Sequence, residues 1–150
     1  MSMRLLLDTN VLLDYYGRRA PFFEDAKRLR IAALFGDVEL WAAAQSFTDA
    51  EYVMRRFAPV EALRAMMAES LAFLSVASSS AADVGEGIRS GWPDLEDFLV
   101  ARCAERVQAD YLLTRDEKGF AQSAVPVLSP AGFFEMLEHD HGIVYDEVGL

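Results

Sequence analysis

Short apolar runs alternate along the chain with longer segments in which apolar residues recur at helical spacing. The short runs predict strands at residues 3–7, 38–42, 73–76, 111–114 and 125–128. The longer segments predict helices at about 21–34, 46–57, 60–71, 81–89, 94–108 and 130–138. Strands that alternate with helices favour a parallel sheet covered on both faces. The predicted fold class is therefore α/β, as one three-layer α/β/α domain with a central parallel sheet.

Length and composition fit a single domain. The 150 residues are 53% hydrophobic, which is enough for a sizeable core. No stretch reaches the roughly 18 uninterrupted apolar residues of a membrane helix, and the N-terminus shows no signal peptide. Cys103 is the only cysteine, which excludes an internal disulfide, and its apolar helical setting indicates a buried packing thiol. We therefore expect a cytoplasmic protein with no membrane association.

The net charge of −10 is unevenly distributed along the chain. The last sixteen residues hold five acids and no Lys or Arg, so residues 1–134 hold 14 basic and 19 acidic groups. We interpret residues 1–138 as the domain and 139–150 as a solvated acidic tail. His139 and His141 belong to that tail and are not interpreted as a metal motif. Charge therefore neither supports nor excludes a nucleic-acid substrate.

Two predicted strands are each followed by a carboxylate. The first strand ends at Asp8, with Thr9 and Asn10 after it, and strand 111–114 ends in Thr114, two residues before Asp116. The carboxyl ends of parallel strands share one edge of a sheet, where ligands bind. Clustered carboxylates at such an edge usually hold a hard cation such as Mg²⁺.

Two further acids, Asp49 and Asp97, lie in the first turns of predicted helices. Each stands three residues after a residue with capping character, Ser46 and Asp94 respectively, which is the spacing of a capping box. An acid at this position can simply satisfy the helix N-terminus, so each one alone is more often structural. Asp116 alone would likewise be read as a turn residue. The four acids together point to one shared site.

The four acids stand at the ends of elements in the order strand, helix, helix, strand. This arrangement resembles that of the PIN-domain nucleases. The resemblance is carried by residues 6–14 (LLDTNVLLD), 48–56 (TDAEYVMRR), 94–98 (DLEDF), 109–116 (ADYLLTRD) and 125–130 (VPVLSP), with Phe120, Phe133 and Phe134 also matching. Each motif is weak alone, but their joint order and spacing are specific. The resemblance covers nearly the whole chain up to about residue 138.

The resemblance implies a ribonuclease that depends on Mg²⁺ or Mn²⁺, often the VapC-like toxin of a bacterial toxin–antitoxin pair. By position, Asp8, Asp97 and Asp116 would be metal ligands, with Asn10 and Thr114 supporting them. Such toxins commonly form homodimers and are inhibited by a small antitoxin protein. The apolar residues that could supply such surfaces, although core packing is the commoner use of most, are Phe22, Phe23, Phe47, Tyr52, Met66 and Met67.

The second acid of the set has two candidates, Asp49 and Glu51. These residues are separated by two positions on a predicted helix. Their side chains therefore point in directions that differ by about 200°, so only one can face the site. We prefer Asp49, because the Thr-Asp-x-x-Tyr pattern resembles a subfamily that uses Asp. Asp94 is expected to be a helix cap or an outer acid of the site. Asp14 is expected to lie on a helix surface and face solvent.

Arg115 and Lys118 flank the proposed site and are the best candidates for holding an RNA backbone. Four other arginines are at least as well explained as solvated positions on helix faces: Arg18, Arg19, Arg55 and Arg56.

Two other readings compete with the nuclease. A phosphatase of the haloacid-dehalogenase type also carries Asp at the end of its first strand, but it needs a second Asp where this chain has Asn10. A PIN-like binding module without activity is favoured by the low positive charge, whereas the four filled acidic positions count against it. Assay of RNA cleavage with Mg²⁺ or Mn²⁺ separates the nuclease from the module.

Overall fold

The computed structural model describes residues 2–145, and its framework is a five-stranded sheet in which every paired strand is parallel. The order across the sheet is β3-β2-β1-β4-β5. The strands are β1 (Met3–Leu7), β2 (Val38–Ala43), β3 (Leu74–Ala77), β4 (Tyr111–Leu113) and β5 (Val127–Leu128). The helices are α1 (Thr9–Tyr16), α2 (Phe23–Leu34), α3 (Ala44–Met54), α4 (Val60–Ser70), α5 (Ala81–Arg89), α6 (Leu95–Arg106), η1 (Glu117–Phe120, a 3₁₀ helix) and α7 (Pro130–His141). The predicted α/β class with a parallel sheet is confirmed.

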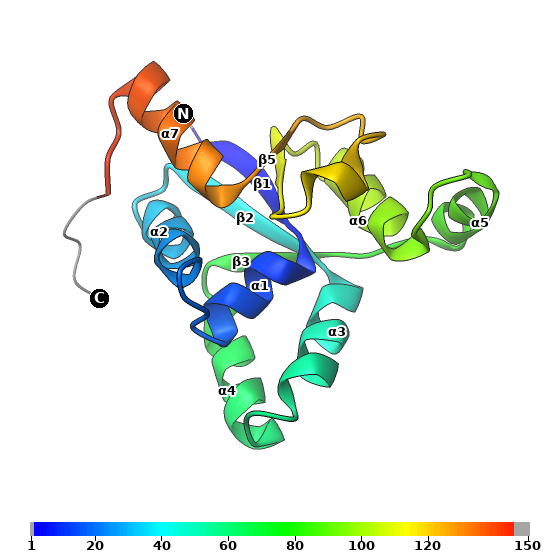
Figure 1. The fold of residues 1–150 in the computed structure, drawn as a ribbon, viewed down its shortest axis with the longest axis horizontal. Helices are drawn as coiled ribbons and strands as arrows, with labels where there is room; N and C mark the ends of the chain where they lie inside the picture. The colour runs from blue at the N-terminus through cyan, green and yellow to red at the C-terminus, as the bar shows by residue number, and fades with distance from the viewer. Residues whose placement is uncertain (1, 146–150) are drawn as a thin grey trace.

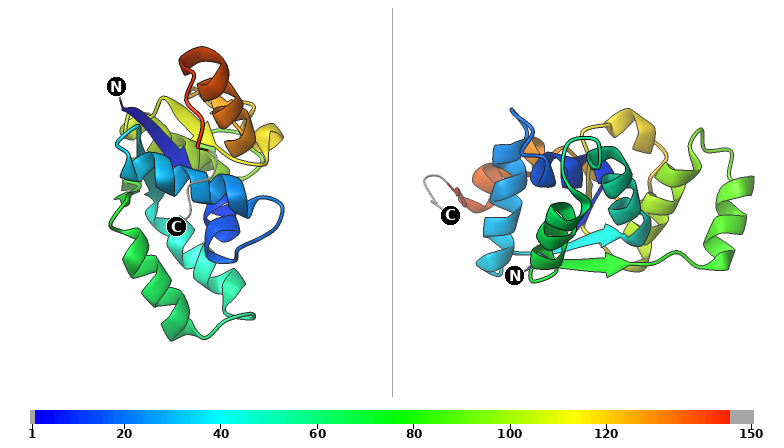
Figure 2. Two further views of the ribbon diagram at one scale, coloured as in Figure 1. Left: turned by 90° about the vertical axis from the view of Figure 1, so that its left-hand side faces the viewer. Right: turned by 90° about the horizontal axis from the view of Figure 1, so that it is seen from below.

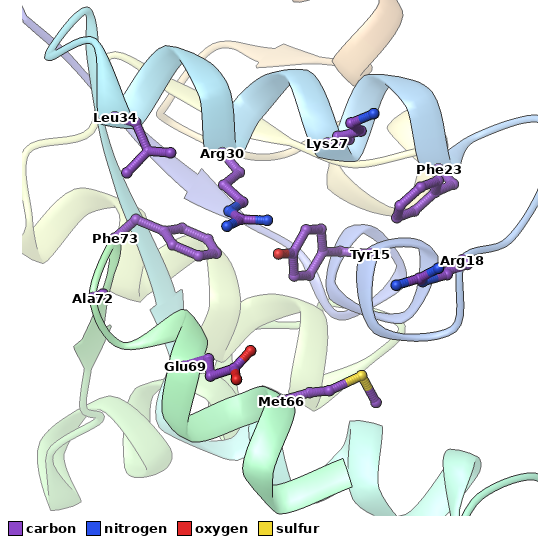
Figure 3. Close-up of a pocket in the computed structure, with 10 residues that line it drawn as sticks. All are labelled: Tyr15, Arg18, Phe23, Lys27, Arg30, Leu34, Met66, Glu69, Ala72 and Phe73. Carbon is purple, nitrogen blue, oxygen red and sulfur yellow. The ribbon is translucent and has the colours of Figure 1, made fainter. Parts of the chain in front are cut away.

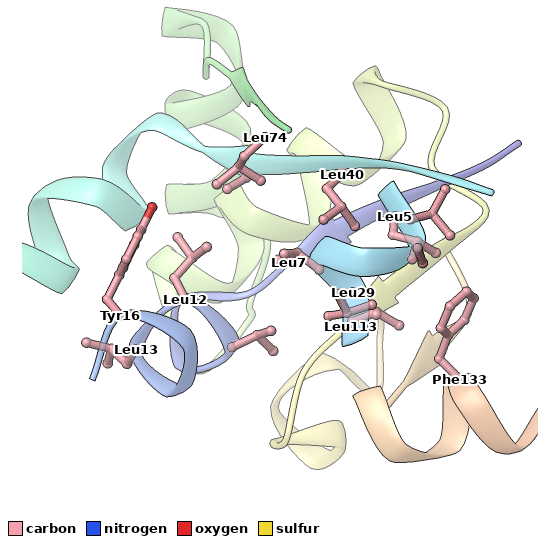
Figure 4. Close-up of a cluster of buried hydrophobic side chains, with 14 of the residues drawn as sticks. Leu5, Leu7, Leu12, Leu13, Tyr16, Leu29, Leu40, Leu74, Leu113 and Phe133 are labelled. Carbon is pink, nitrogen blue, oxygen red and sulfur yellow. The ribbon is translucent and has the colours of Figure 1, made fainter. Parts of the chain in front are cut away.

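Alternate residues of β1 face two different helical layers, as the period of a strand requires. Leu5 and Leu7 are packed with α1, α2 and α7 in one apolar cluster, which Figure 4 shows around Leu29 and Phe133. Leu6 faces the opposite side, in a second cluster with the apolar face of α6. Helix α5 lies on the far side of α6 from the sheet (Figures 1 and 2). Both faces of the sheet are therefore covered, which explains the continuous leucine run of β1.

The order in which strands are added to the sheet reverses between β1 and β4. The chain passes from β1 to β2 on one side, whereas β4 pairs with the other side of β1, with Leu7 opposite Leu113. The crevice beyond the carboxyl ends of two such strands is the usual ligand position in open α/β sheets. Here β1 delivers Asp8 to that crevice, and β4 delivers Thr114.

Several boundaries differ from those that the sequence predicted. Helix α1 follows β1 directly, and the sequence predicted no range for it, although Asp14 was expected to lie on a helix. Helix α7 continues to His141, past the predicted start of the tail at residue 139. Beyond it, Tyr145 is buried, stacks on Phe35 and donates a hydrogen bond to Asp37. The part of the predicted tail up to Tyr145 is thus not simply solvated, and residues 146–150 lie outside the described residues.

Cys103 is fully buried, as expected of a packing thiol. Of the helices in residues 2–145, none combines the length and the apolar character needed to cross a membrane.

Candidate active site

Asp8 is held in one orientation at the start of α1. Its side chain is 6% exposed, and it is the N-cap of the helix. The backbone N–H of Thr9 donates to Oδ1 at 2.8 Å, and the Thr114 hydroxyl donates to Oδ2 at 2.8 Å. Burial raises the pKa of Asp8, although these two hydrogen bonds oppose the rise. Both carboxylate oxygens are therefore fixed before any ligand arrives.

Thr114 links β4 to α1 through its hydroxyl. This buried oxygen accepts a hydrogen bond from Asn10 Nδ2 at 3.2 Å and one from the Asp116 backbone N–H at 3.0 Å. Asn10 Oδ1 in turn accepts from the Arg115 backbone N–H at 3.3 Å. The structure thus links Asn10 to Asp8 through the Thr114 hydroxyl, which explains how the turn after β4 is held against α1.

Asp97 and Asp116 meet at Gly119. Asp116 Oδ1 accepts a hydrogen bond from the Gly119 N–H at 3.2 Å. A Cβ atom at Gly119 would lie 2.6 Å from Asp116 Oδ2 and 3.0 Å from Asp97 Oδ2, so both oxygens flank the space that the missing side chain leaves. Asp94 caps α6 by accepting from the Asp97 N–H at 3.1 Å, which is one of its predicted roles. No motif in the sequence had singled out Gly119.

The Asp97 carboxyl group carries the clearest electrostatic signature of the cluster. Burial raises its pKa to about 7, and the negative charges of Asp94, Asp8, Glu96 and Asp116 add to the rise. These contributions show that Asp8, Asp97 and Asp116 share one region of negative potential. This carboxyl group therefore ionises at a higher pH than an ordinary aspartate.

Glu96 also belongs to this region, and the sequence analysis missed it. Its Oε1 lies 3.2 Å from the Thr9 hydroxyl. Burial raises the pKa of Glu96, and the next largest cause is the charge of Asp49. Asp49 therefore lies near Glu96. The available signal was that residues 96 and 97 are both acids in the first turn of α6.

Glu51 points away from this cluster. It pairs with Arg64 of α4 at 2.5 Å and 3.2 Å, and this contact lowers its pKa. The opposite directions of Asp49 and Glu51 follow from their separation of two residues on α3. Of the two candidates left open by the sequence, Asp49 is the one brought close to the other acids.

Ser46 does not cap its helix, which corrects the expected capping box. Strand β2 runs directly into α3, so the N-cap is Ala43 and Ser46 lies inside the helix. Its fully buried hydroxyl is 2.8 Å from the Thr9 hydroxyl. Ser46 thus ties α3 to the start of α1, and Asp49 is not engaged in a capping box with it.

Asp14 is buried, so the expectation that it faces solvent was wrong. Its side chain is 3% exposed and accepts hydrogen bonds from Arg115 Nε at 2.6 Å and Nη2 at 3.1 Å. The guanidinium carbon of Arg115 also lies 3.9 Å from the centroid of the Phe22 ring. The charge of Arg115 is therefore compensated inside the protein, which weakens its predicted role as a phosphate contact. Lys118 is exposed on η1, beside the cluster.

Comparison with known proteins agrees with this architecture. The family model described as "PIN domain" matches residues 4–118. This chain belongs to the PIN-domain family. A search of curated proteins gave no match.

Solved structures share the PIN fold at low sequence identity. A chain of the Rickettsia felis VapBC2 complex, bound to a promoter DNA fragment, is 16% identical with a TM-score of 0.63, covering 85% of this chain and 98% of that one. A chain of a Klebsiella pneumoniae toxin–antitoxin complex is 21% identical, with a TM-score of 0.61 over 84% and 97%. PAE2754 from Pyrobaculum aerophilum is 15% identical, with a TM-score of 0.61 over 93% and 100%. At these identities the likeness concerns the fold.

The donor set of this PIN-domain chain suits a hard cation. The converging ligands are carboxylate oxygens, which Mg²⁺ and Mn²⁺ prefer, and the gap at Gly119 leaves room between Asp97 and Asp116. Within residues 2–145, no three acidic, His or Cys side chains already stand grouped as a finished metal site. A bound ion would therefore have to draw the carboxylates inward.

The gap at Gly119 yields a direct prediction. Gly119→Ala should place a methyl group between the Asp97 and Asp116 oxygens and force them apart, because the added atom would lie within 3.0 Å of both. We expect Mn²⁺ affinity, measured by calorimetry, to fall by at least tenfold. Gly132→Ala is the matched control, since it lies on α7 and its Cβ would meet only Ser129 Oγ at 3.1 Å and a leucine methyl group. Unchanged Mn²⁺ affinity in Gly119→Ala would show that the ion does not bind between these carboxylates.

A cavity of about 360 Å³ lies away from the acids, between α1, α2 and α4 (Figure 3). Arg30 lies over the Phe73 ring at 5.6 Å, and Arg18 lies over the Phe23 ring at 5.9 Å. The cavity is lined by Tyr15, Arg18, Phe23, Lys27, Arg30, Leu34, Met66, Glu69, Ala72 and Phe73. Three basic residues against a single acid make it a positive region on an acidic protein.

Proposed function

We propose that this PIN-domain chain is an endoribonuclease that hydrolyses RNA phosphodiester bonds and depends on Mg²⁺ or Mn²⁺. The observation that carries the proposal is the convergence of acids from α1, α3, α6 and η1 at the carboxyl end of the sheet. Within it, oxygens of Asp97 and Asp116 both border the space at Gly119. Such a concentration of negative charge destabilises a fold unless a cation binds there.

Asp8, Asp97 and Asp116 would hold the ion. When bound, a divalent ion lowers the pKa of a water molecule and neutralises charge on the leaving oxygen of the phosphodiester. Thr114 and the Thr9 N–H hold the Asp8 oxygens in place, as outer hydrogen bonds commonly do for ligands of a metal. Support from Asn10 reaches Asp8 through Thr114.

Two of the acids have proposed roles in proton transfer. With its pKa near 7, the Asp97 carboxyl group can release a proton when a cation arrives. Asp49 lies near Glu96, and we assign it the role of accepting a proton from the attacking water. Lys118 on η1 is the basic residue best placed to contact an RNA phosphate.

The deciding experiment is RNA cleavage by wild type and by Asp8→Asn in the presence of Mn²⁺. Asp8→Asn keeps the shape of the side chain but removes the charge of a ligand, so we expect cleavage to fall at least 100-fold. Glu61→Gln removes one negative charge from the exposed first turn of α4 and should cleave like wild type. Equal cleavage by wild type and Asp8→Asn would mean that a contaminating nuclease is responsible. No cleavage by wild type on any RNA would favour the inactive binding module.

We also propose that the protein is the toxin of a toxin–antitoxin pair in the bacterial cytoplasm. Support comes from the similar structures, one of which is described as a toxin–antitoxin complex and another as VapBC2 bound to a DNA fragment from its promoter. The cavity in Figure 3, with its basic and aromatic lining, suits an acidic segment of an antitoxin protein. A homodimer is the proposed assembly. Light scattering of the protein alone, and with the product of the neighbouring gene, tests both proposals.

A further inference from the structure

A second hollow, of about 270 Å³, opens beside the acidic cluster. It is lined by Phe22, Asp25, Arg115, Ser129, Pro130 and Ala131. Three segments that are far apart in the sequence meet here: the loop before α2, the turn after β4, and the first turn of α7. The nuclease mechanism proposed above uses none of these side chains. The hollow therefore needs its own explanation.

One wall of the hollow is a stack of two planar groups. The Arg115 guanidinium lies against the Phe22 ring at 3.9 Å, and the edge of the same guanidinium donates two hydrogen bonds to the Asp14 carboxylate. Phe22 remains 40% exposed although it is a large apolar residue. Because Asp14 compensates the charge of Arg115, this wall is flat and nearly neutral. Such a surface suits the face of an aromatic ring better than it suits a phosphate.

The hollow is rigidly connected to the carboxylates. Arg115 is the residue between Thr114 and Asp116, and its N–H is bound by Asn10. Asn10 is bound to the Thr114 hydroxyl, which is bound to Asp8. A ligand in the hollow would therefore contact Arg115, which is the residue next to Asp116, one of the proposed metal ligands.

The other lining residues of the hollow offer polar groups to the edge of a ring. Pro130 has no N–H, and the Gly132 N–H is used by Ser129 Oγ at 3.0 Å. Helix geometry leaves the Ala131 N–H without an acceptor inside the helix. Asp25 adds carboxylate oxygens, one of which also accepts from Arg28 at 2.9 Å. A hollow with one stacking wall and one wall of donors and acceptors matches an unpaired nucleobase.

We propose that this hollow binds a nucleobase of the RNA substrate, next to the phosphate that lies at the acids. The base stacks on Phe22, and Arg115 serves as the rigid backing of that stack. This proposal rests on the proposed ribonuclease function. It makes the hollow a determinant of which nucleotide the enzyme accepts beside the cleaved bond.

The test is binding of a fluorescein-labelled single-stranded RNA by anisotropy, in an Asp8→Asn background that does not cleave it. Phe22→Leu should weaken binding about 5- to 150-fold, the range expected for loss of one base–aromatic stack. Phe22→Trp, which keeps an aromatic ring at this position, should bind the RNA as tightly as the parent does. Phe57→Leu is the matched control, because Phe57 is 77% exposed beyond the end of α3 and should have no effect. Melting temperatures verify that each variant is folded.

A series of RNAs with one abasic position identifies the base. At one position of the RNA, loss of the base should weaken binding of the RNA by the parent protein. The same loss should not further weaken binding of the RNA by Phe22→Leu. Phe22→Leu that binds RNA as the parent does would overturn the proposal, and selective loss of antitoxin binding would instead assign the hollow to a protein partner. The two proposals fail separately: Phe22-dependent RNA binding without cleavage by the wild type would refute only the nuclease.

Discussion

Asp97→Asn is expected to stabilise the metal-free protein and to remove most of its response to metal. The reason is that burial and neighbouring acids raise the pKa of Asp97 to about 7, so its ionised form is unfavourable in the folded state. Allowing for partial exposure, we expect a gain of about 1–2 kcal/mol in unfolding free energy at pH 8. This corresponds to a rise of about 2–8 °C in melting temperature.

The gain should depend on pH in a defined direction. Well below pH 4 the Asp97 carboxyl group is protonated in both the folded and the unfolded wild type, so it causes no penalty. As pH rises from about 4 to 7, the unfolded chain ionises first, and the metal-free wild type loses stability that Asp97→Asn retains. The difference between the two proteins should therefore grow over this range and level off above pH 7. Denaturation in EDTA at several pH values measures it.

Metal should reverse the order of stability. An ion that binds only the folded state at 100 times its Kd stabilises the wild type by about 2.7 kcal/mol, whereas Asp97→Asn has lost a ligand and should respond less. Glu61→Gln is the control and should respond like wild type, because Glu61 is exposed at the start of α4. If all three proteins respond equally to Mn²⁺, the clustered acids do not form a metal site.

Loss of Arg115 is expected to be the most destabilising single change considered. Arg115→Gln would leave the buried Asp14 carboxylate without its guanidinium partner, at a cost of about 3–5 kcal/mol. Asp14→Asn should cost less, because the side chain of Arg115 is 28% exposed and can turn toward solvent, whereas that of Asp14 is 3% exposed. Urea denaturation of both variants tests this asymmetry.

The double variant provides the matched control for this ion pair. Asp14→Asn combined with Arg115→Gln should be more stable than Arg115→Gln alone, because no charge is then left buried and unpaired. The same pair joins α1 to the turn that carries Asp116, so Arg115→Gln should also lower Mn²⁺ affinity. Strictly additive effects of the two substitutions would show that the contact contributes nothing to stability.

Much of the site could be predicted because its residues stand at the ends of elements. A buried parallel strand reads as an unbroken apolar run, so the position of Asp8 at the end of β1 was visible in the chain itself. The same holds for Thr114 after β4 and for Asp94 as the cap of α6. Helix α3 was harder, because the signal at Ser46 favoured a cap where strand and helix in fact join without a turn.

The sequence by itself determined the α/β class, the parallel sheet and the delivery of Asp8 and Thr114 to one edge of that sheet. Those features follow from local periodicity and from the rule that parallel strands end together. Only the tertiary structure decided that Asp14 is buried against Arg115, that Glu51 turns to Arg64, and that Glu96 and Gly119 join the acids. These facts depend on which residues from distant segments meet. Periodicity describes a residue's place on its own element, but not the partner that packs against it.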